Sequence, residues 1–265
     1  MASNRKNAIL LNELIKTDFK LRYQGSVLGY LWAVLRPLLM FAILYVVFAK
    51  ILRFGGDVPH YPVYLLTGTV LWNFFSECTL MGIHAIEGRG DLIRKLSFPK
   101  YIVVVSATST AVINMLINMC VVVIFALING VTPTWGWLLV PLCLAELYLL
   151  ALGISLLLGA IDVKFRDIGS IWEVLMQALF YAVPIIYPIS MVAENSARMA
   201  QILLLNPIAQ IIQDVRYLLI TDQTITSWSY LGVGWTLVPI MLVVILFIFA
   251  AVVFHKKAPY FAEEV

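Results

Sequence analysis

Long apolar stretches alternate with short polar segments along almost the entire chain. A helix needs about 20 mostly apolar residues to cross the hydrocarbon core of a bilayer. Six stretches suit such helices, although the first is short unless it takes in part of Leu28–Leu35. They are, approximately, Pro37–Leu52, Tyr61–Ile83, Tyr101–Ile128, Trp137–Ile161, Ile171–Ile189 and Val233–Phe254. The pattern predicts an all-α membrane protein with six transmembrane helices.

A seventh apolar stretch, Ile202–Ile220, is interrupted by polar residues. They are Asn206, Pro207, Gln210, Gln213, Asp214 and Arg216. A charge at the bilayer centre costs roughly 2.5–3.5 kcal/mol, and proline breaks a helix interior. We therefore expect a re-entrant helical hairpin between the fifth and sixth spans, within an extracytoplasmic region of residues 190–231, and no seventh crossing.

The distribution of positive charge favours six crossings. With a cytoplasmic N-terminus, 14 of the 18 Lys and Arg residues lie in inner segments and four in outer ones, a bias typical of membrane proteins. A seven-span arrangement would place Lys256 and Lys257 outside. Both chain ends are therefore expected in the cytoplasm.

The composition agrees with this interpretation. Apolar residues make up 62% of the 265 residues and charged residues 12%, against about 45–50% and about 25% in soluble chains. The surplus of apolar surface must face lipid. A net charge of +3 is too small to indicate nucleic-acid binding.

Residues 4–23, before the first span, predict an amphipathic helix. Its apolar positions are Ile9, Leu10, Leu14 and Leu21. Such a helix lies in the inner membrane interface, where its lysines meet anionic headgroups. The residues expected to act there are Lys16, Lys20, Arg22 and Tyr23. A simple membrane anchor is the alternative.

The charged segment 87–100 predicts a short helix parallel to the membrane. Asp91 is placed to cap a helix that runs to Ser97, and Phe98-Pro99 stops it. We interpret this segment as a docking knob for a cytoplasmic partner; a solvated loop whose charges only set topology is the alternative. Its expected contact residues are Gly90, Asp91, Leu92, Arg94, Lys95 and Leu96.

Polar residues form stripes within two spans. Thr69, Asn73 and Glu77 recur every four residues, and so do Ser106, Thr110, Asn114 and Asn118, so each set shares a helix face. Such faces turn toward protein or water, which leaves helix packing and channel lining as alternatives. Asn73, Glu77 and Asn114 are our candidates for residues that line the channel.

Glu77 and Glu146 are the carboxylates well inside a span. Neither has a cationic partner in the sequence, so both are candidates either for a functional site or for protonated, hydrogen-bonded groups.

Aromatic residues gather at the outer end of the fifth span. Phe180 and Tyr181 precede Pro184, and Tyr187 precedes Pro188. Two prolines four apart deform a helix, and irregular backbone in a membrane lines a cavity or packs on protein. Because the C–H faces of sugar rings are apolar, Phe180, Tyr181 and Tyr187 are candidates for stacking on a glycan.

Sequence motifs for nucleotide binding and hydrolysis are missing. The chain contains no Gly-Lys dipeptide and hence no phosphate-binding loop. Three isolated cysteines and no Cys/His cluster give no support for disulfides or zinc. We expect no catalytic residue, no metal site and no cofactor on this chain; any ATP would bind another subunit.

Several motifs, in order, resemble those of type-2 ABC exporter permeases for cell-surface polysaccharides. This family includes exporters of O-antigen, teichoic acid and rhamnose-containing wall glycan. The matching segments are Lys20–Trp32, Arg36-Pro37-Leu38, Arg89–Lys95, Phe165–Ile168, Pro184–Pro188 and Leu205-Asn206-Pro207 with Gln210. Gln213-Asp214 and the turn Phe54–Asp57 look closest to the rhamnose-polymer branch.

The resemblance implies a homodimer in the bacterial plasma membrane whose twelve helices enclose a channel. We call residues 87–100 the coupling segment. Two copies of a cytoplasmic ATPase, which hold ATP and Mg²⁺, would contact this segment and residues 4–23. A lipid-linked polysaccharide would move outward, and re-entrant helices around 203–219, with Asn206, Pro207 and Gln210, would close the outer mouth.

Two other functions are consistent with the pattern. One is a permease of the same type for a small lipophilic drug or lipid. The other is a membrane lipid-sugar transferase that uses Glu77 or Glu146. The sequence does not identify the glycan.

Overall fold

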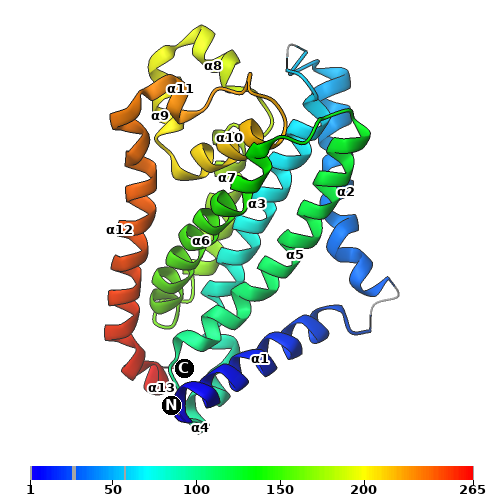
Figure 1. The fold of residues 1–265 in the computed structure, drawn as a ribbon. Helices are drawn as coiled ribbons and strands as arrows, with labels where there is room; N and C mark the ends of the chain where they lie inside the picture. Colours follow the sequence, from blue (N-terminus) through cyan, green and yellow to red (C-terminus); the bar gives the residue numbers. More distant parts are fainter. Residues whose placement is uncertain (1, 26–27, 57, 265) are drawn as a thin grey trace.

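The computed structural model describes residues 2–25, 28–56 and 58–264, and these residues form helices and loops with no strand among them (Figure 1). The elements are α1 (Ala2–Tyr23), η1 (Gly29–Leu31), α2 (Trp32–Leu44), η2 (Tyr45–Ile51), α3 (Tyr61–Ile83), η3 (Glu87–Arg89), α4 (Gly90–Lys95), α5 (Tyr101–Ile128), η4 (Trp135–Leu139), α6 (Val140–Asp162), α7 (Ile168–Ala182), α8 (Ile189–Asn195), α9 (Ala197–Leu204), α10 (Pro207–Leu219), α11 (Ser227–Leu231), α12 (Val233–Lys257), η5 (Ala258–Tyr260) and α13 (Phe261–Glu264). The predicted all-α class is confirmed for these residues.

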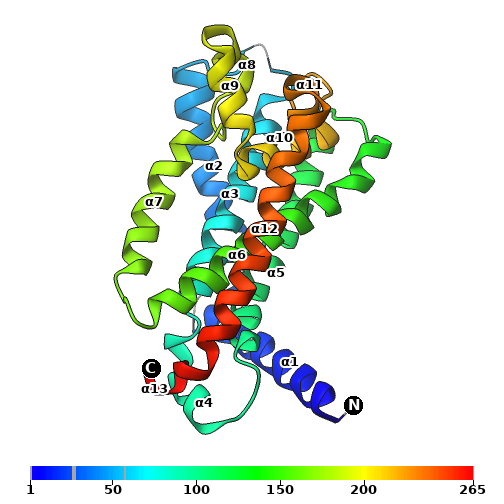
Figure 2. The same cartoon turned by 90° about the vertical axis from the view of Figure 1, so that its left-hand side faces the viewer.

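Helix α3 is the centre of the bundle. It packs along α5 and α6, and α12 covers the other side of α6 (Figures 1 and 2). Of its 23 residues, 17 are buried. A helix so enclosed need not be apolar all round, because its polar groups face protein instead of lipid.

Small residues allow these helices to approach closely. A Cβ atom added to Gly82 of α3 would lie 2.3 Å from Cβ of Ser155, and one added to Gly159 would lie 3.0 Å from the Gly82 carbonyl oxygen. Where α6 meets α12, a Cβ on Gly153 would lie 3.2 Å from Cα of Phe247. Membrane helices associate through such small-residue contacts, because water does not drive apolar groups together in lipid.

Four helical segments are long and apolar enough to cross a membrane. They are Gly29–Ile51, Tyr101–Ile128, Trp135–Asp162 and Gly234–Glu264. A fifth candidate is the pair α9 and α10, which is bent by 93°. Length and composition therefore support four or five spans, and the count of six stays a prediction that requires α3 and α7 to cross as well.

The first span takes in most of Leu28–Leu35, as the sequence allowed, but the predicted end of the fifth was wrong. The first helical path begins at Gly29, eight residues before Pro37, and includes Pro37. Helix α7 ends at Ala182 and does not continue to Ile189. Val183 is extended there (φ −81°, ψ 142°) because the residue before a proline, here Pro184, is driven out of the helical region.

The two ends of the bundle differ in content. Helices α8–α11 gather at one end, whereas α4, α13 and both chain ends lie at the other (Figures 1 and 2). We call them the α8–α11 end and the α4 end. The predicted hairpin corresponds to α9 and α10, which meet near a right angle at Leu205–Asn206.

Candidate functional site

Helix α1 lies across the α4 end and packs against α5 (Figure 1). At its last turn, Arg22 forms an ion pair with Glu77 of α3 and donates a hydrogen bond to Sδ of Met81 (3.1 Å). Asn114 of α5 donates to the same Glu77 carboxylate (2.8 Å). The expectation that Glu77 lacks a cationic partner was therefore wrong. Its partner is 55 positions away in the sequence and reaches it only through the fold.

A second ion pair links α1 to the coupling segment. The Arg89 guanidinium pairs with Asp18 and donates to the Ser106 hydroxyl of α5 (3.1 Å). The Arg89 and Asp18 side chains are 18% and 19% exposed. Asp18 and Arg22 are four residues apart and share a helix face, so this charged face of α1 meets the bundle.

The remaining cations of α1 point elsewhere. Lys20 is exposed, and Lys16 pairs with Glu13 at the surface (3.1 Å). Tyr23 ends the helix, and its side chain lies outside the described part of the chain. Among the predicted interface residues whose side chains the structure describes, Arg22 forms an ion pair and a hydrogen bond with the bundle.

The coupling segment contains a compact helix, α4, with a buried anchor. Ile93 is 2% exposed and packs into a cluster with Ile86 and with Phe261 of α13. The Lys100 ammonium donates to the Ile93 carbonyl (2.9 Å) and closes the end of the helix. Helix α13 contacts α4 directly, and its Phe261 packs on the buried side of the coupling segment.

The outward side of α4 is charged. Asp91, Arg94, Lys95 and Leu96 are exposed, Leu92 is half-buried, and Gly90 is buried. The predicted capping role of Asp91 was wrong: the helix begins at Gly90 and no side chain caps it. Asp91 instead pairs with Arg94 one turn later (2.8 Å).

Near α4, three possible metal ligands come together. Ligand atoms of His84, Glu87 and Asp162 lie within 4.8 Å of one another. All three side chains already have a partner. His84 Nδ1 lies 3.5 Å from the Asp162 carboxylate, and Arg166 Nε lies 3.7 Å from the Glu87 carboxylate. The Arg166 cation opposes a metal ion there, and the cluster is better explained as a network that joins α6 to the coupling segment.

Part of the α3 polar stripe reaches the surface. Asn73, Ser76 and Glu77 are half-buried, whereas α3 is otherwise buried from Val63 to Trp72. They occupy one face at helical spacing. The structure thus joins Asn73, Glu77 and Asn114 into one polar strip, on which Arg22 lies.

At the α8–α11 end, Arg216 of α10 holds the broken end of α7. It is fully buried, and it donates to the carbonyls of Tyr64 (3.1 Å), Pro184 (2.7 Å) and Ile185 (2.6 Å). Its guanidinium carbon lies 3.4 Å from the centre of the Tyr64 ring. The Pro184 and Ile185 carbonyls lie beyond the end of α7, outside its helical hydrogen bonding, and Arg216 satisfies them inside the membrane protein, as burial requires.

The three aromatic candidates lie in different environments. Phe180 is buried against Trp72, with ring centres 6.1 Å apart. Tyr181 is 65% exposed. The Tyr187 hydroxyl donates to the Ala182 carbonyl (2.9 Å). Only Tyr181 presents a large aromatic surface, and Phe180 and Tyr187 support the broken helix end.

The re-entrant candidates form the start of α10. Asn206 Oδ1 accepts a hydrogen bond from the Ile208 amide (2.9 Å), and Pro207 occupies the first helical position, where its missing N–H costs nothing. Gln210 is buried and donates to Asp214 (2.5 Å). Asn206-Pro207 therefore starts a helix here rather than breaking one.

Three residues of these clusters were missed by sequence reasoning: Asp18, Arg89 and Arg216. For Asp18, the spacing to Arg22 on one helix face was an available signal. For Arg216, the signal was an arginine inside an apolar stretch, which is costly unless its donors are bound. For Arg89, nothing in the local sequence distinguishes it from Arg94.

The family model and the relatives that match this chain are all named as transport or export proteins. Residues 10–220 match the family model described as ABC-2 type transporter. The O-antigen export system permease protein RfbA of Myxococcus xanthus is 32% identical over 202 residues, which cover 76% of each chain. An RfbA protein of Klebsiella pneumoniae is 29% identical over 77% of each chain. The polysialic acid transport protein KpsM of Escherichia coli is 22% identical over 77% of this chain and 79% of KpsM.

Proposed function

The chain belongs to the ABC-2 type transporter family, and we propose that it is the membrane subunit of an exporter for a lipid-linked cell-surface polysaccharide. The relatives are named for export of O-antigen and polysialic acid. The same class of cargo was expected from the sequence motifs. Movement of the polymer would use ATP hydrolysed by a separate subunit, because this chain has no phosphate-binding loop.

One observation carries the mechanism: two ion pairs tie α1 to the helices and to the coupling segment. Asp18–Arg89 joins α1 to the coupling segment, and Arg22–Glu77 joins it to the polar stripe of α3. A cytoplasmic ATPase that displaces α4 would pull on α1 through Arg89. The same movement would reach Glu77 of α3 through Arg22, which lies one helical turn after Asp18 on α1.

The exposed surfaces fit a membrane-bound complex. Ile9 and Leu21 of α1 are 57% and 63% exposed, which suits a helix lying in the inner interface. The charged side of α4 faces outward, as a docking surface for the ATPase requires. We propose two copies of each subunit, with the strip of Asn73, Glu77 and Asn114 facing the channel between the two membrane subunits.

The proposed orientation places the α4 end in the cytoplasm of a bacterium. Six crossings, with α3 and α7 included and α9–α10 re-entrant, put both chain ends there. Helix α7 is only 15 residues long, about 22 Å of helix. Residues 183–188, two of whose carbonyls Arg216 binds, would complete its path across the roughly 30 Å core.

Deletion of the chain in its source bacterium tests the function. Surface glycan should disappear while lipid-linked polymer accumulates inside the cell, and both should be restored by the wild-type chain. Unchanged surface glycan would contradict export, and loss of polymer synthesis would favour a transferase. The transferase has little support, since Glu77 is paired with Arg22 and Glu146 lies near the opposite end of the bundle.

A further inference from the structure

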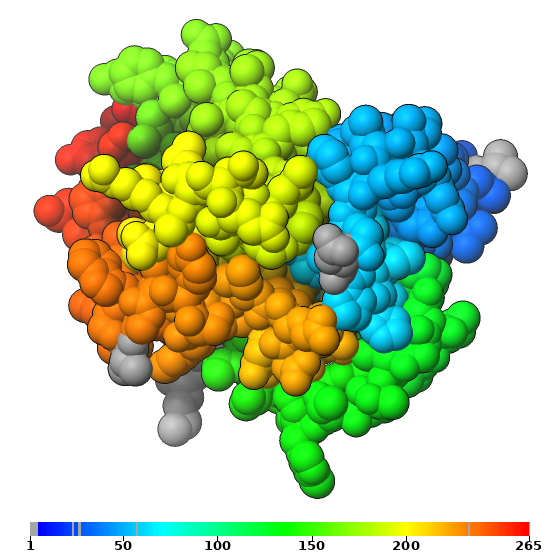
Figure 3. Space-filling model, turned by 90° about the horizontal axis from the view of Figure 1, so that it is seen from above, coloured from blue at the N-terminus to red at the C-terminus, as the bar shows by residue number. Residues whose placement is uncertain are grey.

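A small polar pocket lies at the α8–α11 end, away from the ion pairs described above. The upper face of the molecule brings together the α8–α9 region, the segment after α10 and the residues before α3 (Figure 3). The pocket between them has a volume of about 200 Å³. That is room for several water molecules, at about 30 Å³ each, but less than the 300 Å³ or more of a site for a drug-sized ligand.

The pocket has a rigid floor made of two buried polar side chains. Tyr64 is 2% exposed, and Gln213 is fully buried. The Arg216 guanidinium lies over the Tyr64 ring and binds the Tyr64 carbonyl. This arrangement fixes the tyrosine, so its hydroxyl is presented in one position.

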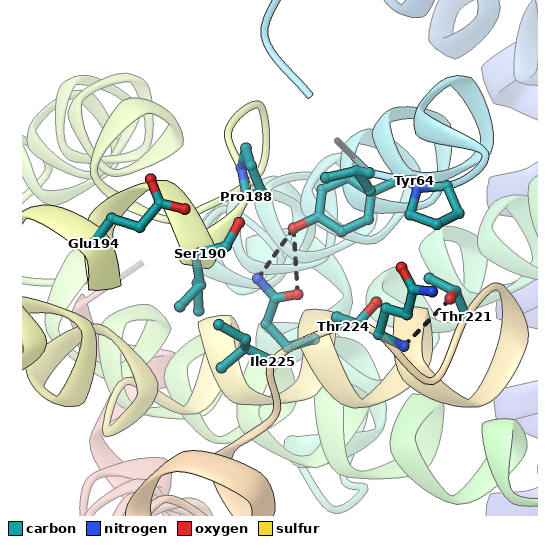
Figure 4. A pocket seen from close by; sticks show the side chains of 12 residues that line it. Tyr64, Pro188, Ser190, Glu194, Thr221, Thr224 and Ile225 are labelled. Atoms are coloured by element: carbon teal, nitrogen blue, oxygen red, sulfur yellow. Dashed lines mark hydrogen bonds between the residues drawn. The ribbon is translucent and has the colours of Figure 1, made fainter. Parts of the chain in front are cut away.

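The floor groups are only weakly engaged with each other. The Tyr64 hydroxyl lies 3.4 Å from Oε1 and 3.3 Å from Nε2 of Gln213 (Figure 4). Both contacts exceed the usual length of a hydrogen bond made by a hydroxyl. A hydroxyl-bearing ligand would offer both groups better partners, since Gln supplies a donor and an acceptor and Tyr supplies both in one atom.

The wall supplies a hydroxyl with no partner. Thr224 is 9% exposed, and its Oγ1 has no hydrogen-bond partner among the described residues. A buried hydroxyl without a partner is destabilising, so a ligand group that bonds to it gains affinity. Ser190 and Thr221 add further hydroxyls around the opening (Figure 4).

The charge of the lining is negative. Glu194 lies at the rim, and the described lining residues include no Lys, Arg or His. The buried cation Arg216 donates its hydrogen bonds to three backbone carbonyls. A ligand with a carboxylate or phosphate would meet Glu194 without a compensating charge.

From these features we infer that the pocket binds one neutral or amino-bearing sugar residue of the exported glycan as it leaves the channel. The inference rests on the proposed function. A sugar ring carries several hydroxyls that donate and accept at once, which matches the hydroxyl and carboxamide lining. The pocket would hold the emerging polymer at the outer mouth and exclude uronic acids.

The test compares Thr224→Val with Thr69→Val in the full transporter, with its ATPase subunit, in lipid nanodiscs. Both changes remove a buried hydroxyl, but the Thr69 hydroxyl bonds only within its own helix. The probes are methyl rhamnoside, methyl mannoside, methyl glucosaminide and methyl glucuronide, with binding measured by saturation-transfer NMR. Polymer export is measured in parallel.

We expect at least one neutral or amino glycoside to bind and the glucuronide not to bind. Thr224→Val should weaken that binding and slow export roughly five-fold, the loss of one hydrogen bond of about 1 kcal/mol. Its unfolding midpoint should not fall, because the hydroxyl has no hydrogen-bond partner to lose among the residues that the structure describes. Thr69→Val should change neither binding nor export.

Three results would overturn the inference: no glycoside binding to the wild type, equal binding of the glucuronide, or equal effects of the two variants. In each case normal polymer export by the wild type would leave the proposed function intact. A wild type that exports no polymer would instead refute the proposed function itself.

Discussion

Arg89 of the coupling segment and Asp18 of α1 form an ion pair that is mostly shielded from solvent. The two residues belong to the two parts of the chain that we expect to contact the ATPase. Ser106 of α5 accepts a hydrogen bond from the same guanidinium. Movement of either segment therefore cannot be independent of the other or of α5.

Breaking this pair should uncouple ATP hydrolysis from export. We expect a double-mutant cycle of Asp18→Ala and Arg89→Ala to give a coupling energy of about 1.5–3 kcal/mol, as for hydrogen bonds to charged groups. Export per ATP hydrolysed should fall in each single variant. Chemical unfolding in nanodiscs and an export assay measure the two effects.

The exposed pair Glu13–Lys16 is the matched control. Its side chains are 63% and 62% exposed, so its coupling energy should be only about 0.2–1 kcal/mol. Equal coupling energies for the two pairs would refute the special role of Asp18 and Arg89.

A second prediction concerns the asymmetry of the Arg22–Glu77 pair. Arg22→Ala leaves a carboxylate within a membrane helix, whereas Glu77→Gln keeps a group that can bond to Asn114. We expect Arg22→Ala to cost about 2 kcal/mol, less than the 3–5 kcal/mol of a fully buried pair, because the side chains are 28% and 25% exposed. Glu77→Gln should cost less.

The double variant separates charge from shape. Adding Glu77→Gln to Arg22→Ala removes the unpaired carboxylate, so the double variant should be more stable than Arg22→Ala alone. Unfolding midpoints of the three variants measure this, and simple addition of the two single effects would count against the ion pair.

Helix limits followed well from the sequence where an apolar run had clear borders. The runs Tyr61–Ile83 and Tyr101–Ile128 match α3 and α5, since Pro, Gly or charged residues flank them. The end of α7 was misplaced because the apolar run continues through Pro184, and backbone sterics, not hydropathy, end the helix.

The site was harder to predict because its contacts are distant in sequence. Asn73, Glu77 and Asn114 were recognised from their spacing, which is a local property of a helix. The ion pairs join α1 to residues 55 and 71 positions further along the chain (Arg22–Glu77 and Asp18–Arg89). The spacing of residues along one helix cannot predict such pairs, because they form only when α1 packs across α5.

A third prediction tests the close contact between α3 and Arg216. A Cβ on Gly68 would lie 2.2 Å from Nη2 of Arg216 and 3.2 Å from the Ile185 carbonyl oxygen. Arg216 cannot move aside without losing bonds to backbone carbonyls. We expect Gly68→Ala to destabilise the protein by about 1–3 kcal/mol, the usual cost of overpacking.

Gly234→Ala is the control for this substitution. It also lies in a helix, α12, but nothing lies within 4 Å of its added Cβ. It should leave the unfolding midpoint unchanged or raise it, because alanine favours helix by roughly 0.5–1 kcal/mol. A Gly68→Ala protein as stable as Gly234→Ala would contradict the described position of Arg216.

A fourth prediction addresses topology. In a background without Cys78, Cys120 and Cys143, single cysteines at Glu263 and Asn195 should react from opposite sides of the membrane. An impermeant maleimide added to intact spheroplasts should label Asn195→Cys, and Glu263→Cys only after permeabilisation. Labelling of Glu263→Cys in intact spheroplasts would exclude a cytoplasmic α13 and place α4, which α13 contacts, on the wrong side for an ATPase.

The last prediction separates glycan contact from structural support among the aromatic residues of α7. Tyr181 is 65% exposed and Phe180 is 8% exposed. Tyr181→Ala should reduce polymer export several-fold while leaving the unfolding midpoint unchanged, because it removes a stacking surface and little packing. Phe180→Ala should lower stability by about 3–5 kcal/mol. Tyr181→Phe should export normally, since the ring and not the hydroxyl would meet the sugar. Loss of export in Tyr181→Phe, or full export in Tyr181→Ala, would remove Tyr181 from the glycan path.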